Sequence, residues 1–240
     1  MAKLEEKHYK YLNNPDFYNN YLQSLYVRLI YSNNIIEEDN GPIEKLFDNA
    51  NISALNDNTI AFNILLNELN TKEERPLTQT LIINVANTIN KHSKYISNGY
   101  RTIENNQKLD DIYPISNPKD IEEDMKKLLN DYYVTWKDKD LFEREALFNI
   151  EFLRIHPFED GNGRTSRLIL NFNIMRNGHA PVLIPEKLRK DYFYARDTEN
   201  VEWIKNMFEE LSQKELEAIE KLIEDYKNDN EIPEDELGYK

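Results

Sequence analysis

Glycine is rare in this chain, and its rarity constrains the fold more than any other feature of the sequence. Only six glycines occur among the 240 residues. A glycine in a helix interior costs about 0.5–1 kcal/mol relative to alanine, so helices contain few of them. The composition therefore predicts an all-α protein. Two of the six, Gly161 and Gly163, lie two residues apart, which marks a place where the backbone does something unusual.

Apolar residues recur at helical spacing through most of the chain, which supports the same fold class. The predicted stripes are Tyr18, Tyr21, Leu22, Leu25 and Leu29; Phe62, Leu65, Leu66 and Leu69; Leu77, Leu81, Val85 and Ile89; Ile121, Met125, Leu128, Leu129 and Tyr132; Phe142, Ala146, Ile150 and Leu153; and Leu216, Ile219, Ile223 and Tyr226. Two Asn-Pro pairs, Asn14-Pro15 and Asn117-Pro118, are typical of helix starts. Ser212 and Glu215 have the spacing of a capping box and predict the start of a C-terminal helix.

Two segments lack this pattern. Residues 99–116 begin with a glycine and contain several turn-forming residues, which predicts a loop or a short hairpin. Residues 32–44 follow the first long helix, and their Asn-Gly-Pro sequence predicts a helix stop. We find no internal repeat and no linker rich in Pro, Gly or Ser, so the chain is expected to form one structural unit.

The composition argues against several classes of function. The formal net charge is −14 at pH 7, and such a surface repels nucleic acid and anionic lipid, so we expect neither as a partner. The chain has no cysteine, which excludes a disulfide, a thiol nucleophile and a Cys-based metal site. No apolar run is long enough to span a bilayer, and the N-terminus lacks the apolar core of a signal peptide. We therefore expect a cytoplasmic protein.

The residues that carry chemistry concentrate in one stretch, which starts at residue 155 with IHPFEDGNGRTSRLILNFNIMRNGHAP. Pro157 disfavours helical geometry at the residue before it, so His156 is expected in an extended or turn segment. The two glycines that follow let the chain approach a ligand closely. A helix is predicted over about 164–176, with Gly178 as its stop, and its nearly continuous apolar surface predicts burial.

A glycine-rich turn at the start of a buried helix is a natural anion site, because free backbone N–H groups and the helix dipole favour negative charge there. Arg164 and Arg167 add two guanidinium groups on the same helix face. Asp160 is the oxygen ligand that a phosphate-bound Mg²⁺ prefers. His156 is the side chain with the pKa best suited to accept a proton near neutral pH. Together they predict a polyphosphate site beside a general base.

The twelve residues from His156 to Arg167, HPFEDGNGRTSR, resemble the signature of the Fic family, HPFx(D/E)GNGRxxR, with every defining position filled. The wider similarity covers roughly residues 75–210 and resembles a bacterial-type member of the family. It implies a compact helical domain with a short β-hairpin flap around 100–114. It also implies a division into an N-terminal helical extension (1–74), the catalytic core (75–210) and a C-terminal helix with an acidic tail (211–240).

The resemblance further implies transfer of AMP from ATP to a Tyr, Thr or Ser hydroxyl of a protein, including self-modification, with release of pyrophosphate. His156 would deprotonate the hydroxyl, and Asp160 would hold Mg²⁺. The implied ATP-binding residues are Phe158, Gly161, Asn162, Gly163, Arg164 and Arg167. Tyr192 and Asn200 match positions that line the adenine pocket in relatives.

Many Fic proteins carry an inhibitory helix with the pattern (S/T)xxxE(G/N), whose glutamate pairs with the second signature arginine. This chain departs from the pattern. With Ser32 as the first residue, Ile36 stands in place of the glutamate. With Asn33 first, Glu37 is the glutamate but the flanking residues differ. We favour Glu37, because a carboxylate is needed to pair with Arg167; the alternative of a plain acidic helix end stays open.

Other functions remain open at this point. Gly163 disfavours the kinase-like branch of the family, in which a lysine stands at the second signature glycine. Transfer of UMP or phosphocholine is compatible with the signature, and so is removal of AMP, for which Glu37 could position a water. A catalytically idle nucleotide-binding module is a further alternative. The sequence also allows a homodimer and does not identify the protein target.

Overall fold

The computed structural model describes residues 3–37, 49–71, 76–93, 98–104 and 115–230, and its regular secondary structure is helical. The α-helices are α1 (Glu6–Leu12), α2 (Pro15–Ile35), α3 (Asn49–Leu69), α4 (Gln79–Ile89), α5 (Ile121–Asn130), α6 (Leu141–Ile155), α7 (Asn162–Arg176), α8 (Arg189–Asp197) and α9 (Val201–Asp229). A π-helix, η2 (Asp131–Thr135), follows α5, and a 3₁₀ turn, η3 (Glu186–Leu188), precedes α8. The described ranges contain no strand, only an isolated bridge between Lys3 and His179. The all-α prediction is confirmed.

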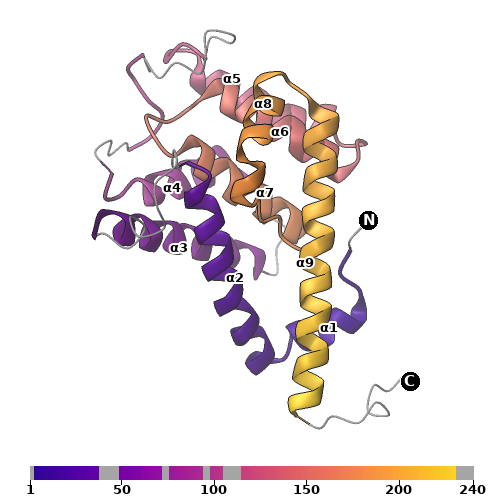
Figure 1. The fold of residues 1–240 in the computed structure, drawn as a ribbon. Coiled ribbons are helices and arrows are strands. Elements are labelled where there is room, and N and C mark those ends of the chain that lie inside the picture. The colour runs from indigo at the N-terminus through magenta and orange to yellow at the C-terminus, as the bar shows by residue number, and fades with distance from the viewer. Residues whose placement is uncertain (1–2, 38–48, 72–75, 94–97, 105–114, 231–240) are drawn as a thin grey trace.

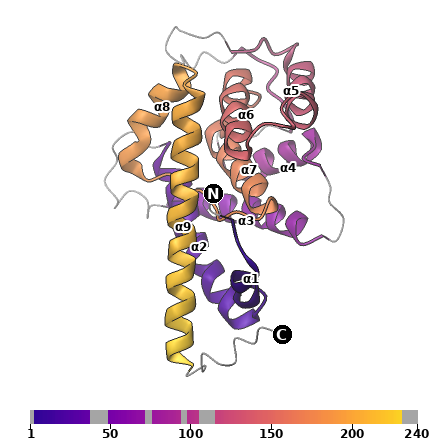
Figure 2. The ribbon, with the colours of Figure 1, turned by 90° about the vertical axis from the view of Figure 1, so that its right-hand side faces the viewer.

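Helix α7 lies at the centre of the molecule, where it packs against α2, α3, α4 and α6 (Figure 1). Most of its residues between Thr165 and Ile174 are buried, in agreement with its apolar sequence. Helix α9 runs along one side of the molecule and packs against α6 (Figure 2). The N-terminal end of α7 is therefore held by helices from both halves of the chain.

The two Asn-Pro pairs behave differently. The side chain of Asn14 accepts hydrogen bonds from the backbone N–H groups of Asp16 and Phe17, so it caps α2 as predicted. The side chain of Asn117 accepts from Lys119 N and its carbonyl accepts from Asp120 N, which forms a turn, and α5 begins later, at Ile121.

The predicted helix start at Ser212 and Glu215 is wrong. Both residues lie inside α9, which is continuous across the boundary at 210/211 proposed above. The Ser212 hydroxyl donates to the carbonyl of Ala180, and the Glu215 carboxylate pairs with Arg28. The spacing matches a capping box, but each side chain instead bonds to a residue far away in the sequence. The other domain boundaries remain predictions.

The predicted hairpin around 100–114 is described only in part. Residues 105–114 lie outside the described residues, and the flanking 99–104 and 115–116 form no strand. The helix stop within 32–44 also lies partly outside them, although α2 does end at Ile35. None of the helices described here combines the length and the hydropathy that crossing a bilayer requires.

Candidate active site

The turn between α6 and α7 places His156 beside the start of α7. His156 ends α6 in the left-handed conformation, with φ 51° and ψ 60°. The prediction of an extended or turn segment is thus met by a left-handed turn. Asn162 closes the loop, because its amide oxygen accepts from Phe158 N at 2.9 Å and its amide nitrogen donates to the Phe158 carbonyl at 2.8 Å. The ring of Phe158 is fully buried in the core.

Both signature glycines lie close against a neighbouring side chain. Gly161 has a positive φ of 73°, and a Cβ there would lie 2.7 Å from Asn90 Oδ1. Gly163 allows a different close approach, since a Cβ at this position would collide with the carboxylate of Glu37. The Glu37 carboxylate therefore lies directly against the first turn of α7.

This first turn has the properties of an anion site. The N-cap is Gly161, which has no side chain to satisfy the free N–H groups of the turn. The helix dipole adds partial positive charge. Arg164 lies in this first turn and Arg167 in the next, and both side chains are mostly buried. The positive charge of the site is thus concentrated where a polyphosphate would lie.

Asp160 is the candidate metal ligand. Its Oδ1 accepts from Gly161 N at 2.6 Å, and its Oδ2 contacts Ser93 Oγ and Arg164 Nη2, both at 3.3 Å. Among the residues described, no cluster of three or more His, Cys, Asp and Glu side chains could hold a metal alone. One carboxylate fits Mg²⁺, which is commonly bound by one or two carboxylates together with phosphates and water. An ion bound there would compete with Arg164 for Oδ2.

His156 is neutral in this structure. Burial lowers the pKa of its imidazole to about 4, and the nearby charges of Arg101 and Arg196 act in the same direction. The carbonyl of Leu153 and the carboxylate of Glu37 favour the protonated ring but do not outweigh burial. The buried Nδ1 has no hydrogen bond of good geometry to any described residue. A neutral ring with a free nitrogen can accept a proton.

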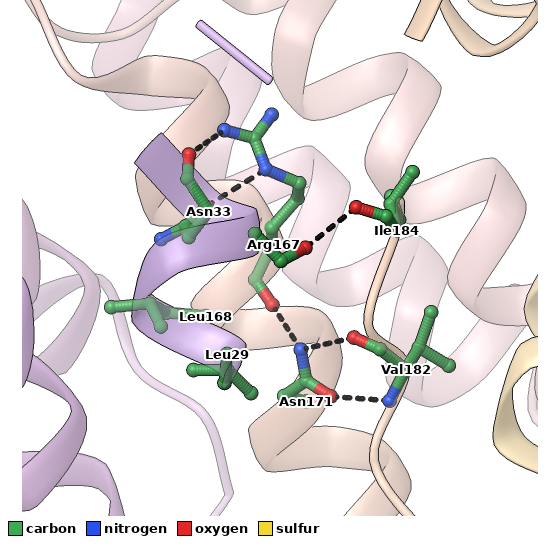
Figure 3. Close-up of a pocket in the computed structure, with 8 residues that line it drawn as sticks. Leu29, Asn33, Arg167, Leu168, Asn171, Val182 and Ile184 are labelled. Carbon is green, nitrogen blue, oxygen red and sulfur yellow. Dashed lines mark hydrogen bonds between the residues drawn. The ribbon is translucent and has the colours of Figure 1, made fainter. Parts of the chain in front are cut away.

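Arg167 is held by the end of α2 (Figure 3). Its Nε donates to Asn33 Oδ1 at 2.8 Å, and its Nη2 donates to the Asn33 carbonyl at 2.9 Å and to Glu37 Oε1 at 2.5 Å. The cavity behind it, lined by Leu29, Val182 and neighbours, measures about 10 Å³, which is room for about one water. This cavity is too small to admit a phosphate.

The carboxylate of Glu37 is charged. Partial burial raises its pKa, but the guanidinium of Arg167 and the charges of Arg164 and Arg196 together hold the pKa of Glu37 below its ordinary value. The helix end that carries it is fixed by Arg189, whose Nε donates to the Ile36 carbonyl at 2.7 Å. The structure thus places Glu37, and not Ile36, against Arg167.

Tyr192 and Asn200 have structural roles in this conformation. Tyr192 is fully buried, and its hydroxyl donates to Asn149 Oδ1 at 2.7 Å. The Asn200 side chain caps α9 by accepting from Trp203 N at 3.1 Å. Their assignment to an adenine pocket remains a prediction.

Three further residues contact the signature, and their positions in the sequence do not signal it. The Asn90 amide donates to the Asp160 carbonyl at 2.8 Å and accepts from Arg164 Nη2 at 3.5 Å. Ser93 reaches Asp160, as described above. Arg101 binds the backbone of His156. All three lie more than 50 residues before the signature, so no local spacing could reveal them.

Known proteins share the signature region. Residues 76–174 match the sequence model of the Fic/DOC family. Protein adenylyltransferase fic-1 of Caenorhabditis briggsae is 40% identical over 78 residues, which cover 32% of this chain and 15% of that protein. Protein adenylyltransferase Fic of Drosophila mojavensis is 51% identical over 49 residues, covering 20% of this chain and 10% of that protein. The matches thus span only a small part of the curated relatives.

Solved structures share the fold over a longer range. A Fic domain containing signaling protein from Bacteroides thetaiotaomicron superposes with a TM-score of 0.74 at 19% identity, covering 90% of this chain and 96% of that one. Fic-1 from C. elegans superposes with a TM-score of 0.67 at 21% identity, covering 85% of this chain and 64% of that one. At these identities the likeness concerns the fold alone.

Proposed function

We propose that this chain, which belongs to the Fic/DOC family, transfers AMP from ATP to a hydroxyl side chain of a protein. One observation carries the proposal: the neutral imidazole of His156 lies in the turn before a helix N-terminus that carries two mostly buried guanidinium groups. The naming of relatives as protein adenylyltransferases supports AMP as the group transferred.

In the proposed reaction, the imidazole of His156 accepts the proton of the target hydroxyl. The hydroxyl oxygen then forms a bond to the α-phosphorus of ATP, the bond from this phosphorus to its bridging oxygen breaks, and pyrophosphate leaves. A pKa of about 4 makes the ring a weak base. The negative charge of a bound polyphosphate would raise this pKa toward the range in which a general base is most effective.

The phosphates would lie on the first turn of α7. Its free N–H groups and Arg164 would stabilise the charge that develops on the α- and β-phosphates, and Arg167 would bind the γ-phosphate. Asp160 would hold Mg²⁺, which supplies further neutralisation of phosphate charge when bound. Asn90 and Ser93 would keep Asp160 and Arg164 in place.

We further propose that Glu37 restrains this reaction. Its carboxylate lies against Gly163 and Arg167, where the γ-phosphate would otherwise bind. The same position favours one second activity, removal of AMP from a modified protein, because a carboxylate at the phosphate site could orient an attacking water. Loss of AMP from a labelled protein that requires Glu37 would establish this second activity.

The test is labelling with ATP that is radioactive at the α-phosphate, in the presence of Mg²⁺ and the purified chain. We expect label on the protein itself, more of it in Glu37→Gly, and none in His156→Ala. His8→Ala is a matched control, because it also removes a buried histidine, here one that pairs with Glu220 on α9.

Equal labelling of wild type and His156→Ala would contradict the role of His156. Stronger label from UTP than from ATP would mean that the chain transfers UMP and not AMP. The absence of label in every variant, together with undetectable binding of ATP, would exclude the proposed function.

A further inference from the structure

Arg101 is a buried arginine whose hydrogen-bond partners among the described residues are all backbone carbonyls. It precedes α5 in the chain, and only 1% of its surface is exposed. No carboxylate of a described residue lies within ion-pair distance of it. Burial lowers its pKa, and the charge of Glu104 opposes this only in part. A guanidinium stays charged even so, and a buried charge must be compensated by hydrogen bonds.

These bonds bind the turn that carries His156. The Nε of Arg101 donates to the His156 carbonyl at 2.7 Å, and Nη2 donates to the Ile155 carbonyl at 3.5 Å. The backbone N–H of Arg101 donates to the Pro157 carbonyl at 2.9 Å. Three consecutive carbonyls, centred on the candidate base, are therefore bound by one residue.

The bound turn is one that L-residues rarely adopt. His156 has φ 51° and ψ 60°, and the left-handed conformation costs a residue with a Cβ about 1–2 kcal/mol. Such a conformation persists only where the surroundings enforce it. The hydrogen bond from His156 N to the Phe152 carbonyl, at 3.0 Å, fixes one side of the residue, and Arg101 fixes the other.

The remaining donors of Arg101 bind a second part of the chain. Nη1 donates to the Ile103 carbonyl at 3.2 Å, and Nη2 also donates to the Ser116 carbonyl. A planar guanidinium holds its five N–H groups in one fixed fork. It therefore holds these carbonyls and those of the His156 turn in fixed positions relative to one another. Lysine has no such fork.

We propose that Arg101 is a positioning residue for His156: its guanidinium holds the left-handed turn, and thereby directs the imidazole toward the anion site. The kinetic part of this inference rests on the proposed AMP transfer. The geometric part does not, because it concerns the position and environment of one histidine ring.

The experiment compares Arg101→Met and Arg101→Lys in the Glu37→Gly chain, with Arg28→Met as the matched control. Arg28 pairs with the buried Glu215, so its loss should destabilise the fold without touching the turn. The rate of self-labelling is measured against ATP concentration, at temperatures where circular dichroism shows each variant to be folded. The pKa of His156 is followed separately by NMR; the chain has four histidines, and His156→Ala identifies the resonance.

For Arg101→Met, we expect the maximal rate to fall about a hundredfold, as for a base displaced by about 1 Å, with the ATP concentration for half-maximal rate within about twofold. The maximal rate of Arg101→Lys should lie between those of the Glu37→Gly chain and Arg101→Met. If Arg101→Met does not fold, Arg101→Lys is the variant compared. The pKa of His156 should rise above about 4 in Arg101→Met, because release of the turn lessens the burial that lowers this pKa most, and because a nearby positive charge is lost. Arg28→Met should change neither quantity.

The inference is overturned if folded Arg101→Met keeps its maximal rate within about twofold, or if its loss lies only in the ATP dependence. It is also overturned if the pKa of His156 is unchanged. Should no chain label and none bind ATP, the proposed function fails, and the NMR comparison alone still decides whether Arg101 positions the ring.

Discussion

Glu37 and Glu145 contact α7, one near each end, and their pKa values are shifted in opposite directions. Glu37 meets Arg167 near the N-terminal end of the helix, where the positive end of the dipole and two more arginines hold its pKa below the ordinary value. Glu145 lies in α6 and accepts from Asn173 near the C-terminal end of α7 and from the Tyr132 hydroxyl. Burial raises the pKa of Glu145 to about 7, and these two hydrogen bonds and Arg144 lower it only in part.

The comparison shows that burial and the charge of the hydrogen-bond partner decide the chemistry. Both carboxylates have hydrogen-bond donors, but only Glu37 faces a guanidinium that donates to it directly. Glu37 is also 39% exposed and can leave its position, whereas Glu145 is fully buried. A charged, displaceable carboxylate at an anion site suits regulation of ligand binding, and a buried carboxyl with neutral partners suits the core.

The largest effect is expected from Glu145→Ala. It leaves the Tyr132 hydroxyl and the Asn173 amide buried without their partner, so the free energy of unfolding should fall by about 3 kcal/mol. Glu37→Gly should change it by no more than about 1 kcal/mol, because that pair is partly exposed. Urea denaturation measures both. Equal losses of unfolding free energy in the two variants would show that the two carboxylates contribute alike to stability.

The second prediction concerns pH. Because the pKa of Glu145 is about 7 in the folded chain and 4.5 when unfolded, its contribution to stability is present below pH 4.5 and is lost as the pH rises to 7. The stability of wild type relative to Glu145→Gln should therefore fall by about 2–3 kcal/mol over this range. His156 acts in the opposite direction: its contribution is present above pH 6.5 and is lost as the pH falls toward 4.

Denaturation of both chains at pH 4.5 and pH 7 checks this prediction. The two slopes oppose each other in wild type, so Glu145→Gln should gain stability with rising pH more steeply than wild type does. Parallel curves would mean that Glu145 is ionised in the folded chain, like Glu37.

The third prediction concerns ligand binding. Glu37→Gly removes the carboxylate that occupies Arg167, so we expect the transfer rate at limiting ATP to rise about tenfold, in line with the loss of one charge-assisted hydrogen bond. ATP with Mg²⁺ should also raise the melting temperature of Glu37→Gly more than that of wild type. Glu145→Gln, at the other end of α7, should change neither. If Glu37→Gly responded to ATP as wild type does, Glu37 would not compete with the phosphates for the site.

The smallest effect is expected from Tyr132→Phe. It removes one of the two hydrogen bonds to Glu145, which should cost about 1 kcal/mol and raise the pKa of Glu145 further, because this bond favours the charged form. The pH dependence of stability should extend above pH 7 in this variant. An unchanged curve would show that the Tyr132 hydrogen bond does not lower the pKa of Glu145.

Features that depend on neighbouring residues could be predicted from the sequence. The apolar stripes place most helices, Asn14 caps α2, and the stretch from His156 to Arg167 brings a base, a carboxylate and two arginines together because its residues are adjacent. Local patterns misled where a side chain has a distant partner. Ser212 and Glu215 have the spacing of a helix start, but both lie inside α9, where they bind Ala180 and Arg28.

The sequence by itself therefore determined the all-α class and the residues of the turn before α7, since glycine content, helical periodicity and the spacing of His156, Asp160 and Arg164 are properties of contiguous chain. Only the tertiary structure decided that Glu37 lies on Arg167 and that Arg101 holds the turn of His156. These contacts join residues 130 and 55 positions apart, and they form because whole helices pack against α7 and desolvate the groups between them.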